Sequence, residues 1–190
     1  MKKSVIIAIA VAVVIAIVGV IFFMSRGNGG NAENNSKPKG TVVDLKLDFK
    51  HMNNTVYSAK ISISEDDKVI EQKADEPNFV RIENTKDNYG LDLTLDTEAK
   101  EGYEQLKNSA KEKNNTFKEV KFGKYDGYYS DSVDGLYGYV LLDESDATFN
   151  AFIMFNLYVN DQRENETNLE NVYKTKIQNI LNSIEFNTSK

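Results

Sequence analysis

The chain has 190 residues, with 23 basic and 29 acidic side chains and a net charge of −6. It contains no cysteine, which excludes disulfides, thiolate metal sites and cysteine nucleophiles. Residues 27–190 hold 20 of the basic and all 29 acidic residues, and this net charge of −9 argues against a nucleic-acid partner. The lack of cysteine, together with frequent Asn, Lys and Ile, favours a bacterial source.

The first predicted element is an apolar run of 20 residues, Val5 to Met24, with Lys2 and Lys3 before it and Arg26 after it. As a helix this run is about 30 Å long, which is the thickness of a bilayer's hydrocarbon core. The sequence therefore predicts one transmembrane helix within an N-terminal membrane anchor, residues 1–26. The run exceeds the apolar stretch of a cleaved signal peptide, which favours an uncleaved signal anchor and leaves cleavage as the alternative. The positive-inside rule predicts a single-pass protein with its C-terminal domain outside the cytoplasm.

A polar segment, residues 27–40, follows the anchor and has almost no apolar side chain to bury, so we expect a flexible spacer. An extracytoplasmic domain is predicted for residues 41–187. It begins with alternating apolar and polar residues at 43–49 and 57–63, a pattern that predicts a β-hairpin.

Further elements follow in the order of two strands, a helix, several strands, a helix and a last strand. The first helix is expected after an N-cap at Asp96 or Thr97. The second carries an apolar stripe that includes Ile177 and Ile180, with Glu170 expected on its exposed side. Strands are expected at 79–82, 89–95, 117–122, 125–129, 136–142, 151–159 and 183–186. This order predicts the α+β class, with an antiparallel sheet packed with two helices.

The same order resembles the PsbP/Mog1-like α/β sandwich over residues 41–187. The end of the chain, residues 177–186 (IQNILNSIEF), is similar to the close of many small bacterial members of that family. Residues 121–128 (KFGKYDGY) resemble its central passage from strand through glycine to strand. Members act as extrinsic or anchored accessory and binding proteins, so the resemblance implies a binding module and no catalytic residues.

Few residues suggest a catalytic or metal-binding site. One histidine, His51, supports neither a catalytic triad nor a zinc site, and we expect it in a solvated turn. Two acidic turns, one with Asp131 and Asp134 and one with Asp143 and Asp146, leave calcium as an alternative to turn formation, although neither has EF-hand spacing. No catalytic, cofactor-binding or metal-binding residues are assigned, and no cofactor is expected.

Tyrosines gather on adjacent predicted strands, and such a face can stack on a sugar or hold a peptide. The alternative is that cross-strand aromatic pairs only stabilise the sheet. The possible ligand face comprises Tyr125, Tyr128, Tyr137 and Tyr139.

We expect a membrane-anchored extracytoplasmic binding or accessory domain that is not an enzyme and acts on a protein or other partner in the cell envelope. The expected location is the cell membrane. A carboxylate-based hydrolase of the envelope is one alternative, and it would need two acids in one cleft. The ectodomain of a membrane sensor complex is another, in which a partner would carry the signal because Met1 to Lys3 is too short to do so.

Overall fold

The computed structural model describes residues 40–49, 55–113, 116–132, 135–143, 148–160 and 167–189. The predicted anchor, residues 1–26, and nearly all of the predicted spacer lie outside these described residues. Within the described part of the chain, none of the helices combines the length and the apolar content that a bilayer crossing requires.

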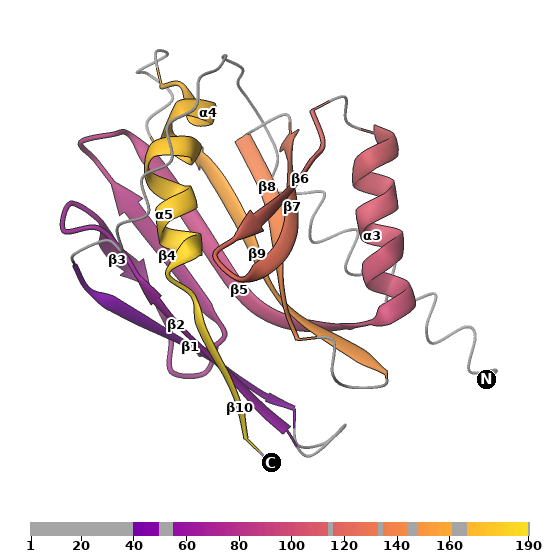
Figure 1. The fold of residues 1–190 in the computed structure, drawn as a ribbon. Helices are drawn as coiled ribbons and strands as arrows, with labels where there is room; N and C mark the ends of the chain where they lie inside the picture. Colours follow the sequence, from indigo (N-terminus) through magenta and orange to yellow (C-terminus); the bar gives the residue numbers. More distant parts are fainter. Residues whose placement is uncertain are drawn as a thin grey trace.

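The described strands form a small sheet of three strands and a large sheet of seven, and all neighbouring strands are antiparallel (Figure 1). The small sheet has the order β1 (Val42–Phe49), β2 (Thr55–Ser62) and β10 (Glu185–Ser189). The large sheet has the order β3 (Lys68–Glu71), β4 (Phe79–Asn84), β5 (Tyr89–Ala99), β9 (Phe149–Val159), β8 (Gly135–Asp143), β7 (Tyr125–Ser132) and β6 (Lys118–Phe122).

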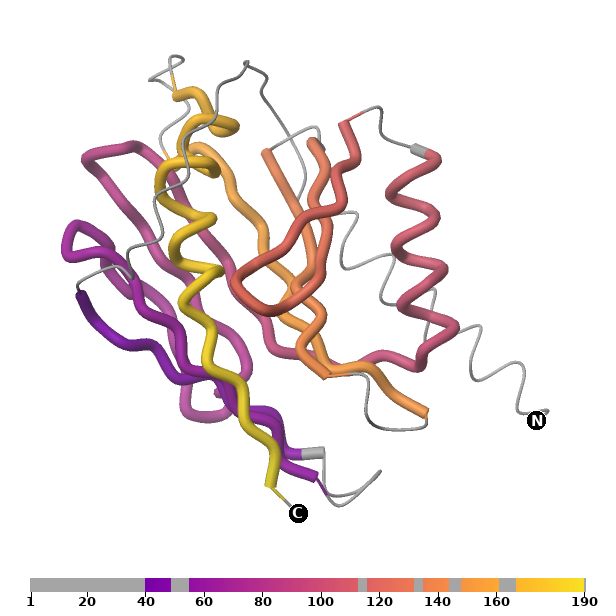
Figure 2. Tube along the Cα trace, in the orientation of Figure 1, coloured from indigo at the N-terminus to yellow at the C-terminus, as the bar shows by residue number. Residues whose placement is uncertain are grey.

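Helical segments cover both faces of the large sheet (Figure 1). One segment is α3 (Lys100–Lys113), which follows β5 without a linker, as the trace in Figure 2 shows. The other is a continuous run that we call the closing helix, and it lies beside the small sheet. It comprises α4 (Leu169–Val172), the π-helical turn η1 (Tyr173–Ile177) and α5 (Gln178–Asn182).

The alternation of side chains explains why the large sheet carries a layer on each side. In β5, Leu91, Leu93 and Leu95 are fully buried in the main core, which also includes side chains of the small sheet and the closing helix. Successive side chains of a strand point to opposite faces, so Asp92 and Thr94 lie on the other face. We call this second face of the large sheet the outer face, and α3 packs against part of it.

The predicted fold class, α+β with one antiparallel sheet packed with two helices, was wrong. The described chain is mainly β-structure in two sheets, with only two short helical segments. The first hairpin pairs with β10, with Ala59 opposite Phe186, and does not join the large sheet. Strand β3 was not predicted at all. Alternation along a sequence marks a strand with one buried face, but it does not say which distant strand will pair with it.

The first helix also begins later than predicted. Asp96 and Thr97 still belong to β5, which pairs with β9 until Ala99 lies opposite Phe149. The backbone groups of Asp96 to Ala99 are already paired with β9, so the helix cannot begin there, and α3 begins at Lys100. The strand thus places α3 directly over the end of the outer face.

A hairpin turn fixes β6 and β7 at the far edge of the large sheet. Gly123 adopts a φ of +61°, a left-handed conformation that glycine accepts without strain. Its N–H donates to Oδ1 of Asn182 at 2.8 Å, so the hairpin is held against the end of the closing helix. The opposite side of the same hairpin faces the region next to α3.

Candidate functional site

A hollow of about 500 Å³ lies where α3 meets the β6–β7 hairpin on the outer face. Its volume falls in the usual range for small-ligand sites. Three elements supply most of its wall, α3, β6 and β7, and one residue comes from β8. The lining residues are Tyr103, Glu104, Lys107, Glu119, Val120, Lys121, Asp126, Gly127, Tyr128 and Leu141.

Charged side chains of both signs form the rim of this hollow. Lys107 on α3 reaches across to Glu119 on β6, with 3.0 Å between Nζ and Oε1. Lys121 pairs with Asp126 within the hairpin, with 2.7 Å between Nζ and Oδ1. Glu104 is the third carboxylate of the lining. The rim therefore offers several hydrogen-bonding groups whose charges largely cancel.

Tyr128 forms part of the hollow and also belongs to an aromatic cluster between α3 and the large sheet. Its ring lies 5.1 Å from that of Tyr139, 6.3 Å from that of Tyr103 and 5.3 Å from that of Phe117, measured between centroids. Phe152 completes the contact, 5.8 Å from Tyr103. We call this group, Tyr103, Phe117, Tyr128, Tyr139 and Phe152, the tyrosine cluster.

The hydroxyl of Tyr128 has no hydrogen-bond partner among the described residues, although the side chain is only 1% exposed. Burial raises its pKa far above the usual range, and the neighbouring Tyr139 and Tyr103 raise it further. The hydroxyl therefore stays protonated at all ordinary pH values, as a neutral donor or acceptor. A buried polar group without a partner destabilises the folded state, so its presence calls for an explanation.

The four tyrosines of the predicted ligand face do not lie together. Tyr128 and Tyr139 are neighbours in the tyrosine cluster, and Tyr137 packs against its edge on the same face. Tyr125 lies on the opposite face, in the main core, where its hydroxyl accepts a hydrogen bond from the N–H of Phe186 at 3.3 Å. The ligand role of these residues remains a prediction, but only three of them share a surface.

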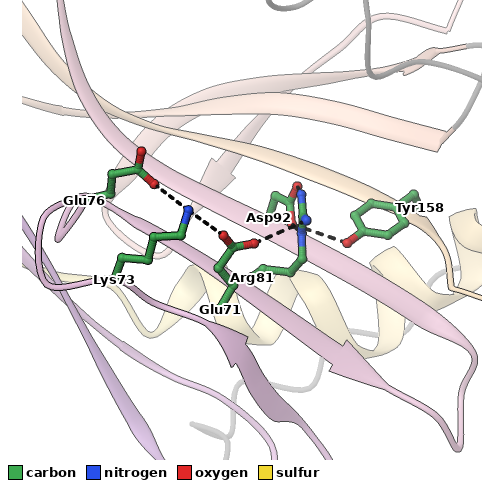
Figure 3. A network of polar contacts seen from close by, with 6 residues as sticks. All are labelled: Glu71, Lys73, Glu76, Arg81, Asp92 and Tyr158. Carbon is green, nitrogen blue, oxygen red and sulfur yellow. Dashed lines mark hydrogen bonds and ion pairs between the residues drawn. The ribbon is translucent and has the colours of Figure 1, made fainter.

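A second polar group includes Asp92 of the outer face and reaches β3 and the connection between β3 and β4 (Figure 3). Arg81 binds Asp92 through two nitrogens and also lies 3.4 Å from Glu71. Glu71 in turn pairs with Lys73, which reaches Glu76. Within this group each charge has an opposite charge beside it, so its ion pairs most simply serve to hold neighbouring strands together.

Two of the other sequence candidates, Asp131 and Asp143, are described, and neither lines the hollow. His51, Asp134 and Asp146 lie outside the described residues, while Asp131 and Asp143 lie in β7 and β8. Over the described ranges, no group of His, Asp and Glu is arranged to hold a metal ion.

Sequence reasoning missed the charged rim of the hollow and the pair of Arg81 and Asp92. Lys107 and Glu119 belong to a helix and a strand whose approach depends on tertiary structure, so no local pattern marks them. For the tyrosines, the spacing along the sequence already indicated that Tyr125 and Tyr128 could not share a face. Residues 125 and 128 are three apart, and in a strand such residues point to opposite faces.

No family model matches the sequence, and no curated protein matches it either. A crystal structure of a protein from Bacteroides thetaiotaomicron VPI-5482 is similar at 12% identity, with a TM-score of 0.39. The similarity covers 67% of this chain and 44% of that one, so the chain spans less than half of that protein. At this level the likeness carries no argument. Membership of the PsbP/Mog1-like family stays a prediction.

Proposed function

We propose that this chain is a membrane-anchored extracytoplasmic binding or accessory domain, and that it holds an envelope partner at the hollow between α3 and the β6–β7 hairpin. One observation carries the proposal. Charged groups from separate elements converge on a hollow of about 500 Å³ next to a buried tyrosine whose hydroxyl has no partner among the described residues. Convergent polar groups around a cavity are the usual mark of a binding site.

The apolar run from Val5 to Met24 supports the membrane part of the proposal, because its length suits a bilayer. The rim of the hollow favours binding over hydrolysis. Hydrolysis by two carboxylates requires one acid to donate a proton and the other to act as base or nucleophile. Here Glu119 and Asp126 each have a lysine ammonium group within 3.0 Å, an arrangement that suits hydrogen bonding to a ligand better than proton transfer.

Site-specific photo-crosslinking in the native host tests the proposal. A photoreactive amino acid replaces Lys121 at the hollow, and in a matched variant it replaces Lys60 on the small sheet. The full-length chain is used, and products are taken from the membrane fraction after a high-salt wash. We expect one discrete crosslinked product at position 121 and none at position 60. Equal products at both positions, or none at either, would contradict a binding site at the hollow.

Protease protection tests the anchoring separately. We expect the full chain to stay in the membrane fraction at high salt, with residues 41–190 digested only by protease added from outside. A released form as the main species would contradict the anchor but would leave the crosslinking result interpretable.

A further inference from the structure

Helix α3 is held to the large sheet by few contacts. Over residues 100–112 only Tyr103 and Ala110 are buried, and Leu106 is half-buried. The closing helix, of the same length, buries six apolar or aromatic residues: Leu169, Val172, Tyr173, Ile177, Ile180 and Leu181. An element with so few buried apolar contacts opens at a lower free energy than the core does. Of the two helical segments, α3 is therefore the one that opens first.

Helix α3 is fixed at its N-terminal end by β5 and is joined to the large sheet at the hollow by an ion pair. The helix continues directly from the end of β5, which is fixed by its pairing with β9 up to Ala99. At the hollow, the ion pair between Lys107 and Glu119 joins α3 to β6 across the rim. Its Glu119 side chain is 58% exposed, and exposed ion pairs of this kind add little stability.

The side chains that α3 covers include a hydroxyl without a partner among the described residues. Tyr128 and Tyr139 belong to strands of the sheet, and their ring centroids lie 5.1 Å apart with the planes tilted by 31°, while the ring of Phe152 lies 5.3 Å from that of Tyr139. In the closed arrangement α3 supplies no partner for the Tyr128 hydroxyl. Phenylalanine at this position would pack equally well without an unpaired polar atom. The tyrosine therefore costs stability in the closed state, and a ligand that bonds its hydroxyl would recover that cost.

We propose that α3 lifts from the large sheet about its junction with β5 and takes Tyr103 with it, and that the rings left on the sheet, Tyr128, Tyr139 and Phe152, bind a neutral saccharide. This inference rests on the proposed function and adds a ligand class and a gate to it. Saccharides have hydroxyls that can pair with Tyr128 and apolar ring faces that pack on aromatic rings.

The rim favours a neutral ligand over a charged one. An anion would have to compete with Glu119 and Asp126 for the two lysines and would also meet Glu104, whereas a cation would have to compete with the lysines for two of the three carboxylates. A neutral hydroxyl can accept from a lysine and donate to a carboxylate while both ion pairs persist. An amphipathic peptide helix is a poorer occupant, because apolar side chains in place of those of α3 would leave the Tyr128 hydroxyl unpaired again.

A crosslink that clamps α3 tests the gate. The full chain has no cysteine, so Lys107→Cys with Glu119→Cys gives two thiols that a short bis-maleimide can bridge. Asp44→Cys with Lys60→Cys, opposite each other on β1 and β2, is the matched control. Each double variant, in detergent, is compared with the same protein capped by a monofunctional maleimide. We expect α3 amides to exchange hydrogen well before those of the closing helix, and the α3 clamp alone to remove this difference. Exchange of both helices at one common rate in the unclamped protein would overturn the gate.

Binding to an array of neutral oligosaccharides tests the ligand. We expect the full chain to bind at least one of them, and Tyr128→Phe to weaken that binding about tenfold, the effect of one lost hydrogen bond in a buried site. Clamping α3 should abolish binding, while the control clamp on the small sheet should not. Absence of any bound saccharide, or equal binding by Tyr128→Phe, would overturn the inference. A protein crosslinked at position 121 together with an empty array would leave the proposed function standing and remove only the saccharide.

Discussion

Arg81 on β4 and Asp92 on β5 lie opposite each other and make a two-point contact, with Nε to Oδ1 and Nη2 to Oδ2 both at 2.8 Å. Tyr158 lies next to this pair (Figure 3), and its hydroxyl donates to the same Oδ1 at 3.4 Å. Asp92 is only 8% exposed. A carboxylate so poorly hydrated depends on the guanidinium for its stability in the folded state.

Replacement of this arginine should therefore destabilise the domain. We expect Arg81→Ala to lower the free energy of unfolding by about 2–3 kcal/mol, less than for a fully buried pair because the Arg81 side chain is 33% exposed. Arg81→Lys should recover only part of the loss, since an ammonium group cannot make the two-point contact. Urea unfolding followed by circular dichroism gives the values.

The matched control for this prediction is Lys86→Ala. Lys86 and Asp66 are also 2.8 Å apart, but both side chains are well exposed. Solvent screens such a pair, and the unfolding midpoint should not move. If Lys86→Ala and Arg81→Ala had the same effect, burial of Asp92 would not be the cause.

Two tyrosine-to-phenylalanine changes should have effects of opposite sign. Tyr128→Phe removes a buried hydroxyl without a partner among the described residues, and we expect it to stabilise the fold by about 1 kcal/mol. Tyr89 is equally buried, but its hydroxyl donates to Oδ1 of Asp67 at 2.5 Å. Tyr89→Phe should destabilise by about 1.5–3 kcal/mol, the range for a hydrogen bond to a charged group. Thermal melts of the two variants check both signs, and destabilisation by Tyr128→Phe would mean that its hydroxyl is paired.

The strands were largely predictable, whereas their assembly into sheets was not. Alternating residues located β1 and β2 because one face of each is buried, for example at Val43 and Ile61. The pairing of β10 with β2 joins residues more than 120 positions apart, and nothing local encodes it. Strand β3 escaped notice because it is four residues long, with Val69 and Ile70 exposed side by side, so it shows no alternation.

The candidate site was predictable only in part, again because it depends on tertiary contacts. The spacing of two residues predicted that Tyr137 and Tyr139 share one face of a strand, and they do. The position of the helix that covers Tyr139 could not be predicted. The expectation that Glu170 is exposed was wrong. Its side chain is 13% exposed, because Lys118 from β6 and Lys174 from the next turn approach it at 2.9 and 3.1 Å.

Glu170 should make stability depend on pH. Burial acts to raise its pKa, but hydrogen bonds from Lys118 and Lys174 outweigh burial and hold the pKa below the usual value of 4.5. A carboxyl with a lower pKa in the folded state stabilises the fold above its unfolded pKa, and this contribution is lost as the pH falls through the folded pKa. We therefore expect Glu170→Gln to lose stability at pH 7 and to show a smaller further loss than the parent between pH 5 and pH 3. Parallel pH profiles of the two proteins would contradict this.

The closing helix should be sensitive to the loss of apolar contacts at Ile180. Ile180 is fully buried in the main core, together with Ile177 one turn earlier. Truncation of Ile180 to alanine removes apolar contacts and leaves a cavity between the closing helix and the sheets, so we expect a loss of about 2–5 kcal/mol. Asn179→Ala on the same helix is the control, because its amide donates an exposed hydrogen bond to the carbonyl of Thr175 at 3.2 Å. Denaturant unfolding measures both variants. An unchanged midpoint for Ile180→Ala would mean that the apolar side of the closing helix does not pack against the sheets in solution. Some other surface would then have to cover that side of the helix.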